Sequence, residues 1–328
     1  MKNYEQFLID RKKGIGGSNA AAVFGMSPYD TPLSLYLNKI GAVVEKPSPA
    51  KAKIYERGHI LEAFLQAMFE RDYGVKVTKQ EKCIHDKYEF IRGHVDGVVE
   101  ADNAIVEYKT TSTSSKDVWG EELTDGIPKH YLLQCHHYML IHDKYEKVYV
   151  PVYQANHTAL QMLTNCVKKY GVDLSLLDDI DISLRLYVVQ RNKKLEELMI
   201  KKYIEFWQQH VELRVPPTWS NYEDILSLFP KSEEKEVVAD QQTMAVVEDI
   251  KSKQAEIKQL EEAIEKDKAL ICDKLQTAER LVDDSGKKLV SWTSSIRNSF
   301  DMSSFKEHHA DLAEEFYKVV STRTFRTF

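Results

Sequence analysis

The chain has 328 residues, of which 43% are hydrophobic and 29% are charged, and this composition is typical of a globular protein. It excludes collagen-like, mucin-like and largely disordered classes, and the length favours one large domain with a smaller one. With 45 basic and 51 acidic residues the formal net charge is −6, so a role in nucleic-acid binding would require a local basic groove or bound cations.

The N-terminal half predicts helices followed by strands. We expect a helix over 3–11, a glycine turn, a helix over 31–41, a loop over 45–53, and a helix over 54–72 in which apolar residues recur at helical spacing. Residues 75–110 change to a period of two, which predicts three strands: VKVTKQEKCI, YEFIRGHVDGVVE and AIVEYKT. A tight turn at 101–103 joins the last two.

The following segment alternates between helix and strand. We expect a polar loop over 110–116, a helix over 130–143, strands over 147–155 and 184–191, and a helix over 192–212 that the Pro216-Pro217 pair ends. Such a mixture of strands and helices predicts an α/β fold.

The composition changes beyond Pro230. Residues 232–280 are densely charged and contain no glycine or proline, which predicts a long helix. Isoleucine recurs every seven residues in it, at Ile250, Ile257, Ile264 and Ile271. Most positions three residues later are polar, which disfavours a full coiled-coil seam and favours a helix that packs one face, on this chain or on a partner. A hairpin over 281–292, a helix near 303–317 and a strand over 319–325 follow, so we predict domains 1–230 and 231–328.

Two further patterns bear on the cellular setting. No run reaches the roughly 18 apolar residues of a membrane span, and the first residues show no signal-peptide core. The four cysteines lie far apart without a CxxC pair, so we expect free thiols in a reducing cytoplasm and neither disulfides nor a thiolate zinc site.

The segment GHVDG at 93–97, followed by EYK at 107–109, is the strongest chemical signal. Residues two apart on a strand share a face, so Glu107 and Lys109 point the same way, and a hairpin brings Asp96 beside Glu107. Two neighbouring carboxylates repel, and a divalent cation offsets that repulsion. Oxygen ligands select magnesium or manganese rather than zinc, and the lysine can orient a water or steady a phosphoryl oxygen.

Simpler interpretations stay open for several of these residues. Asp96 can be a turn residue and Glu107–Lys109 an edge-strand ion pair, although a lone carboxylate in the apolar strand VDGVV is costly. The turn GIGGS opens a helix that Ser18 or Asn19 can cap, and exposed amides there favour a phosphate. Adjacent histidines at 136 and 137 diverge on a helix and do not indicate a metal site. The Trp119 region fits a DNA-facing loop as well as internal packing.

Five ordered motifs resemble the lambda-exonuclease/YqaJ-type phage recombination nucleases of the PD-(D/E)xK superfamily. They are RxxGIGGSNAAAV at 11–23, RGxxLE at 57–62, GHVDG at 93–97, EYKT at 107–110 and PxxYxxQ at 128–134. The resemblance, which covers roughly residues 8–155, implies a nuclease core with a central mixed sheet flanked by helices. The predicted C-terminal extension of a long helix, a hairpin, a short helix and a strand rests on the residue pattern beyond Pro230.

The resemblance also implies roles for single residues. Asp96, Glu107 and the Tyr108 carbonyl would hold magnesium, with manganese as a substitute and two ions per site, and Glu62 would support the second ion. Lys109 would position the attacking water, while Tyr131 and Gln134 would line the site. Arg11 and Ser18 would bind the 5′-terminal phosphate.

As a function, the resemblance implies a 5′-to-3′ exodeoxyribonuclease acting on linear duplex DNA. It would leave 3′ single strands for an annealing or recombinase protein and would form a ring, a trimer in relatives. The alternatives are a restriction- or repair-type endonuclease of the same superfamily and a non-catalytic DNA-end-binding adaptor.

Overall fold

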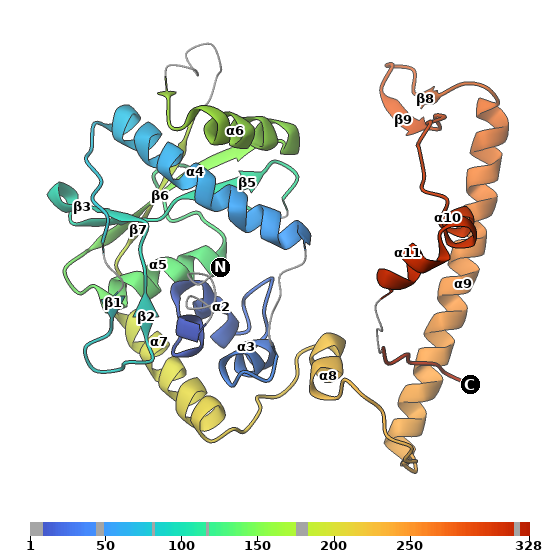
Figure 1. The fold of residues 1–328 in the computed structure, drawn as a ribbon, viewed down its shortest axis with the longest axis horizontal. Helices are drawn as coiled ribbons and strands as arrows, with labels where there is room; N and C mark the ends of the chain where they lie inside the picture. Colours follow the sequence, from blue (N-terminus) through green and yellow to red (C-terminus); the bar gives the residue numbers. More distant parts are fainter. Residues whose placement is uncertain (1–8, 44–48, 81–82, 116–117, 175–182, 318–321) are drawn as a thin grey trace. The chain divides into compact units, whose positions relative to one another are not determined.

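The computed structural model describes residues 9–43, 49–80, 83–115, 118–174, 183–317 and 322–328 (Figure 1). Its backbone contacts divide the chain into two compact units, residues 1–228 and 229–328, which are described separately. None of the helices within those described ranges is both long and apolar enough to cross a membrane. All four cysteines are free thiols, as the sequence predicted.

The first unit begins with short helical segments and continues into one long helix. A 3-10 turn η1 (Gly17–Asn19) leads into α2 (Ala20–Val23), α3 (Pro32–Lys39) and α4 (Pro49–Tyr73). Thr31 caps α3, because its hydroxyl accepts a hydrogen bond from the Ser34 amide at 3.0 Å while the Ser34 hydroxyl accepts one from the Thr31 amide at 2.9 Å. The start of α3 is therefore fixed locally.

A mixed sheet forms the centre of this unit (Figure 1). Strand β6 (Lys147–Ala155) pairs in parallel with β4 (Ala104–Val106) and, further along, with β5 (Lys109–Ser112). On its other side β6 pairs antiparallel with β7 (Arg185–Gln190), and β3 (Gly97–Val99) pairs antiparallel with β4. A small separate ladder joins β1 (Cys83–Ile84) to β2 (Arg92–Gly93).

Helices cover both faces of the sheet, because alternate residues of β6 enter different clusters. Helices α4 and α6 (His157–Tyr170) pack on the face that carries Tyr149 and Tyr153, and α5 (Lys129–Ile141) packs on the face that carries Val148, Val150 and Val152. A third cluster joins α2 and α3 to α7 (Lys193–Glu205) and the π-helical stretch Phe206–Glu212, and α8 (Tyr222–Leu228) packs against α3. The predicted α/β fold with a central mixed sheet flanked by helices is confirmed.

The second unit has little core of its own. It contains the 35-residue helix α9 (Gln241–Leu275), the hairpin of β8 (Arg280–Val282) and β9 (Lys288–Ser291), and the short helices α10 (Met302–His308) and α11 (Ala310–Glu315). Among the described residues of this unit, Leu275 is the one buried hydrophobic side chain. The predicted long helix and hairpin are present.

Several predicted elements are wrong in detail. Helix α4 begins at Pro49 inside the expected loop 45–53, and the expected single strand over 104–110 is broken into β4 and β5. Strand β5 extends to Ser112 into the expected polar loop 110–116, and helix α6 was not predicted. The expected helix 303–317 is divided at His309 into α10 and α11.

Two predicted elements lie partly outside the described residues. Of the expected helix over 3–11, residues 9–11 are described and are helical. Of the expected strand over 319–325, residues 322–325 are described and form no strand.

Candidate active site

Asp96 enters the site from the segment between β2 and β3. Its Oδ2 accepts a hydrogen bond from the Tyr108 amide at 2.8 Å, which ties the segment to the strand break between β4 and β5. The pKa of Asp96 is raised well above its ordinary value, first by burial and then by the neighbouring Glu107 carboxylate, against a smaller opposing effect of Lys109. Asp96 therefore lies in a field that favours bound positive charge.

Glu107 lies at the break itself. Its backbone amide donates to the Tyr149 carbonyl at 2.9 Å, and its side chain is almost wholly buried. Glu107 Oε1 accepts from Lys109 Nζ at 2.6 Å and from Gln134 Nε2 at 2.7 Å. Glu107 Oε2 is also buried, yet no hydrogen-bond donor reaches it from the residues that the structure describes. One carboxylate oxygen is therefore held by the protein and the other is left for a ligand.

Lys109 is a protonated neighbour rather than a base. Burial alone would lower its pKa, but the charges of Glu107 and Asp96 and the hydrogen bond to Glu107 outweigh burial and raise it above the ordinary value. Its Nζ also donates to Gln134 Oε1 at 3.2 Å and lies 4.7 Å from the centre of the Tyr131 ring. The ammonium can hold a water or a phosphoryl oxygen.

Helix α5 supplies the cover of the site. Tyr131 and Gln134 share one face of this helix, and Gln134 Nε2 also contacts the Tyr138 hydroxyl at 2.9 Å. The predicted grouping of Tyr131 and Gln134 with Lys109 is therefore present as geometry, and Tyr138 is an addition that sequence reasoning missed.

Glu62 approaches the same site from α4. Its charge contributes to the raised pKa of Asp96, so it lies within electrostatic range of that carboxylate. Its side chain is 28% exposed and lies 3.9 Å from Lys79 Nζ, measured from Oε1. Among the described residues no group of three or more His, Cys, Asp or Glu side chains is close enough together to hold a metal ion without further ligands.

Arg11 and Ser18 lie at the glycine turn, and both are exposed. Asn19, one of the two predicted alternatives, occupies the N-cap position of α2, but its side chain makes no capping hydrogen bond, and Ser18 lies inside η1. Asn19 Oδ1 instead accepts from the Gly16 amide at 3.3 Å and from Lys39 Nζ at 2.9 Å. Asn19 Oδ1 therefore joins Lys39 of α3 to the glycine turn.

Lys39 links this turn to the Arg11 segment, and sequence reasoning missed it. Its Nζ donates to the Arg11 carbonyl at 2.6 Å, and its side chain is only 6% exposed. Burial, together with the charge of Arg11, lowers the pKa of Lys39 to about 7, against an opposing effect of Asp30. The turn therefore rests on a charge that is lost near neutral pH.

The glycine turn is connected to the carboxylates through side chains of α5. A Cβ atom on Gly17 would lie 2.7 Å from the Tyr138 ring, so only glycine allows η1 to approach α5 this closely. Tyr138 in turn contacts Gln134, whose amide holds Glu107. A continuous set of contacts therefore joins the turn of Ser18 to the carboxylates.

One of the adjacent histidines of α5, His137, is a buried core residue, as the sequence predicted for one of the pair. His137 Nε2 lies 2.8 Å from the Arg92 carbonyl and Nδ1 lies 3.0 Å from the Tyr203 hydroxyl. Complete burial lowers the pKa of His137 to about 4, so it stays neutral. His137 therefore connects α5 to β2 and to α7.

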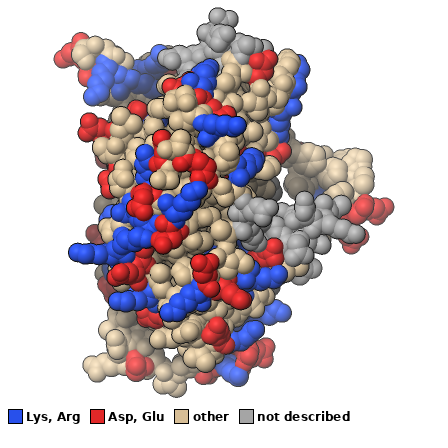
Figure 2. Space-filling model, turned by 90° about the vertical axis from the view of Figure 1, so that its left-hand side faces the viewer, with Lys and Arg blue, Asp and Glu red and all other residues tan. Residues whose placement is uncertain are grey.

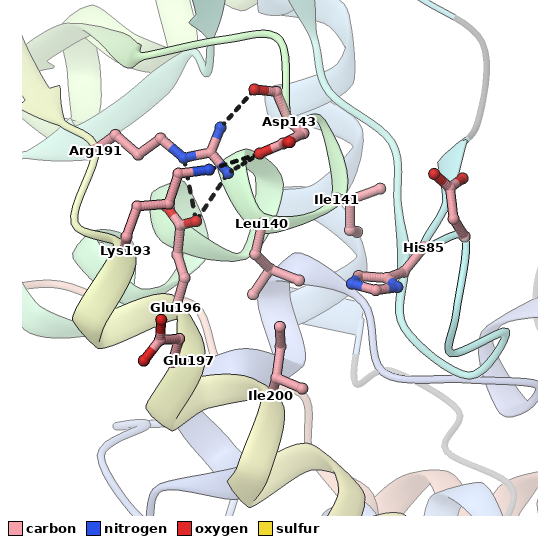
Figure 3. A pocket seen from close by; sticks show the side chains of 10 residues that line it. His85, Leu140, Ile141, Asp143, Arg191, Lys193, Glu196, Glu197 and Ile200 are labelled. Carbon is pink, nitrogen blue, oxygen red and sulfur yellow. Dashed lines mark hydrogen bonds and ion pairs between the residues drawn. The ribbon is translucent and has the colours of Figure 1, made fainter.

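A pocket of about 330 Å³ lies elsewhere, at the C-terminal end of α5 beside α7 (Figure 3). It contains none of the predicted site residues. Arg191 borders it and donates to Glu196 Oε2 at 2.8 Å and to the carbonyls of Asp143 and Tyr145 at 2.9 and 3.0 Å. These bonds hold the chain after α5 against α7, so this wall of the pocket has a structural role.

Charge is mixed on the face of the molecule seen in Figure 2. Basic and acidic side chains are interspersed there, in keeping with the near balance of 45 basic and 51 acidic residues. That face therefore shows no uniformly basic surface.

Comparison with known proteins identifies the region that carries the motifs. Residues 6–145 match the YqaJ-like viral recombinase domain family. Across the whole chain, the uncharacterized protein YqaJ of Bacillus subtilis (strain 168) is 26% identical over 335 residues, covering 98% of this chain and 93% of that protein. The predicted resemblance to the YqaJ-type phage recombination nucleases is confirmed for the region that carries the motifs.

Two solved structures are also similar. An alkaline exonuclease from Laribacter hongkongensis is 16% identical, with 64% of this chain and 93% of that chain covered and a TM-score of 0.44. A phage-related exonuclease from Haemophilus somnus 129PT is 16% identical, with 62% and 96% covered and a TM-score of 0.38.

Proposed function

We propose that this chain is a metal-dependent exodeoxyribonuclease that digests the 5′-ended strand of linear duplex DNA and leaves a 3′ single strand. The observation that carries the proposal is the Glu107 carboxylate. It is buried, Lys109 and Gln134 hold one of its oxygens, and the other has no donor among the described residues. A buried carboxylate oxygen without a partner is costly unless a cation or ligand approaches it.

The donor set fits a hard divalent cation. Asp96 and Glu107 provide carboxylate oxygens, the Tyr108 carbonyl directly follows Glu107 in sequence, and the field that raises the pKa of Asp96 would be relieved by positive charge. We assign two magnesium ions to these groups, with manganese as a substitute and Glu62 supporting the second. When bound, such ions supply Lewis-acid activation of water and charge stabilisation at phosphoryl oxygens.

The residues of the chain position the substrate around that centre. The Lys109 ammonium stays protonated and donates hydrogen bonds, so it orients a water or a phosphoryl oxygen beside Glu107. Gln134 bonds both Lys109 and Glu107 and fixes their separation. Lys109 and Glu107 would orient the attacking water beside a bound ion, which would supply the activation of that water.

The end preference is assigned to Arg11 and Ser18. Both side chains are exposed, and η1, which carries Ser18, packs against Tyr138 next to the carboxylate cluster. A terminal phosphate held by an arginine would place the next phosphodiester at the carboxylates. We further propose that the protein acts in the cytoplasm, as a ring of copies around DNA, trimeric by resemblance, and that it delivers the 3′ strand to an annealing or recombinase protein.

Strand-specific digestion tests this proposal. Linear duplexes labelled on each strand, with and without a 5′ phosphate, are incubated with magnesium, manganese or calcium. We expect loss of the 5′-ended strand with magnesium or manganese and none with calcium, and a preference for the phosphorylated end that Arg11→Ala removes. Glu107→Gln and Asp96→Asn should abolish cleavage without changing the circular dichroism spectrum. Cleavage of closed circular DNA would instead identify an endonuclease, and full activity in both carboxylate variants would refute the assignment of the site.

A further inference from the structure

A series of aromatic side chains runs from the candidate active site to the protein surface. The Tyr131 ring lies under Lys109 Nζ at 4.7 Å and stacks on Trp119, with ring centres 5.6 Å apart and an interplanar angle of 28°. The ring centres of Tyr131 and His130 lie 4.0 Å apart. The ring centres of His130 and Tyr29 lie 5.8 Å apart, and these two rings are perpendicular. We call Tyr29, His130, Tyr131 and Trp119 the aromatic series.

The inner end of the aromatic series is fixed and the outer end is open. Trp119 packs on Tyr187 with ring centres 5.2 Å apart, and Tyr187 is completely buried. Tyr29, by contrast, is 65% exposed. An edge-to-face contact with His130 orients the Tyr29 ring. The series therefore presents one oriented aromatic ring to solvent.

Tyr29 is also connected to the segment assigned to the 5′ phosphate. The Ser27 hydroxyl accepts from the amides of Tyr29 at 3.1 Å and Asp30 at 3.2 Å, which fixes the backbone before α3. The Asp30 charge acts on Lys39, and Lys39 Nζ bonds the Arg11 carbonyl. Tyr29 is thus linked by contacts to Lys109 on one side and to the Arg11 segment on the other.

We propose that Tyr29 is a stacking platform for an unpaired nucleobase at the 5′ end of the strand being cleaved. This inference rests on the proposed function. A phosphodiester can reach the buried carboxylates only if the end of its strand leaves the duplex stack, and its base then loses its neighbours. An aromatic face replaces them without regard to sequence, because every base has a π-face. A nuclease that digests DNA of any sequence requires that tolerance.

The test compares DNA ends that carry or lack the terminal base. The full-length protein digests 5′-phosphorylated duplexes whose terminal nucleotide is either normal or a stable abasic analogue. Base–aromatic stacking is worth about 5- to 150-fold in affinity, so we expect kcat/KM of the natural protein to fall by a factor in that range on the abasic end. Tyr29→Ala and Tyr29→Leu should show the lower value on both ends, while Tyr29→Phe keeps the full difference.

A matched control and a binding measurement separate this inference from the proposed function. Tyr170, which is 58% exposed on α6, serves as the control, and Tyr170→Ala should behave as the natural protein. In the Glu107→Gln background, a 5′-terminal 2-aminopurine should lose fluorescence on binding, and Tyr29→Leu should prevent that loss. If Tyr29→Leu retains both the quenching and the dependence on the terminal base, the stacking role is overturned. If quenching occurs but the natural protein cuts no DNA, the stacking role stands and the proposed nuclease function fails.

Discussion

The two oxygens of the Glu107 carboxylate lie in different environments, and Gln134 is responsible for much of the difference. Its Nε2 donates to Glu107 Oε1 at 2.7 Å, while its own Oε1 accepts from Lys109 at 3.2 Å. A neutral amide can satisfy a carboxylate and an ammonium together, whereas a charged side chain would satisfy only one. Gln134 is therefore a positioning residue that keeps Oε1 occupied and Oε2 available.

We expect Gln134→Leu to lower kcat on linear duplex DNA by about ten- to a hundredfold, because hydrogen bonds to charged groups contribute roughly 1.5–3 kcal/mol. The Lys109–Glu107 pair should remain, so cleavage should weaken without disappearing. Steady-state kinetics together with the melting temperature measures both effects. An unchanged kcat in a well-folded variant would show that Gln134 is only a packing residue. Gln161→Leu, on α6, is the matched control.

Lys39 gives the stability of the protein a specific dependence on pH. Its pKa is about 7 in the folded protein because of burial and the charge of Arg11, and it returns towards the ordinary 10.5 on unfolding. Between these values the unfolded chain binds more protons, so the free energy of unfolding rises with pH by up to about 1.4 kcal/mol per unit. Below about pH 7 the lysine is protonated in both states and contributes no slope.

Lys39→Met should remove that slope. Urea unfolding followed by circular dichroism at intervals from pH 7 to pH 9 compares the variant with the natural protein and with Lys194→Met, which changes an exposed lysine of α7. The natural protein and Lys194→Met should gain stability over this interval relative to Lys39→Met. Parallel curves for all three proteins would mean that Lys39 titrates near its ordinary pKa.

At the scale of elements, the break between β4 and β5 makes the site. The Glu107 amide still bonds β6 through the Tyr149 carbonyl, whereas the Tyr108 amide bonds the Asp96 carboxylate instead of a neighbouring strand. The segment that carries Asp96 is held by close packing at Gly97, where a Cβ atom would lie 2.3 Å from Val77 Cγ1. Valine is stiff at χ1 and cannot swing away, so the absence of a side chain at Gly97 sets the position of β3.

Gly97→Ala should therefore destabilise the first unit by about 1–3 kcal/mol, through overpacking against Val77. It should also lower activity, because Asp96 is the preceding residue. Val77→Ala removes the clashing methyl groups, so the double variant should recover part of the stability lost in Gly97→Ala. Thermal unfolding of the two single variants and the double variant measures this coupling. If the losses of stability in the two single variants simply add in the double variant, Val77 is not the residue that an alanine at position 97 clashes with.

The elements differ in how far sequence alone could predict them. Strand β6 and helices α3, α5 and α9 follow local periodicity and were predicted, whereas the break at Glu107–Tyr108 depends on partners twelve and more residues away. Helix α6 was missed although Asn156 caps it and Leu160, Leu163 and Val167 face the core at helical spacing. That signal was local and could have been found.

The residues of the site also differ in how far the sequence alone could predict them. The grouping of Asp96, Glu107 and Lys109 follows from strand geometry, and that of Tyr131 and Gln134 from the family resemblance. Lys39 could not be found, because a lysine at the end of an amphipathic helix is normally solvated. Its burial depends on the fold bringing the Arg11 carbonyl and Asn19 to it.

At the scale of the whole chain, the second unit forms its secondary structure locally. Asp240 caps α9, with Oδ1 accepting from the Thr243 amide at 2.7 Å, and Lys253 pairs with Asp249 at 2.6 Å one turn away. Ile257 and Ile264 remain 55% and 52% exposed, and Leu275 is the one buried hydrophobic side chain among the described residues of the unit. Local interactions of this kind stabilise helices only marginally, so this unit is too poor in core to fold cooperatively by itself.

The first unit, by contrast, contains all the residues assigned to the site and all three hydrophobic clusters. We therefore propose that residues 1–228 are a separate nuclease domain, and that a chain ending at Leu228 folds and retains metal-dependent cleavage. Circular dichroism, thermal unfolding and digestion of labelled linear duplex compare it with the full-length protein and with the full-length double variant Ile257→Asp/Ile264→Asp. Reduced processivity in both altered proteins would assign the isoleucine face to assembly of copies or to an annealing partner. An insoluble or unfolded shortened chain, together with a destabilised double variant, would show that this face belongs to a core shared by the two units, and the division into two domains would be wrong.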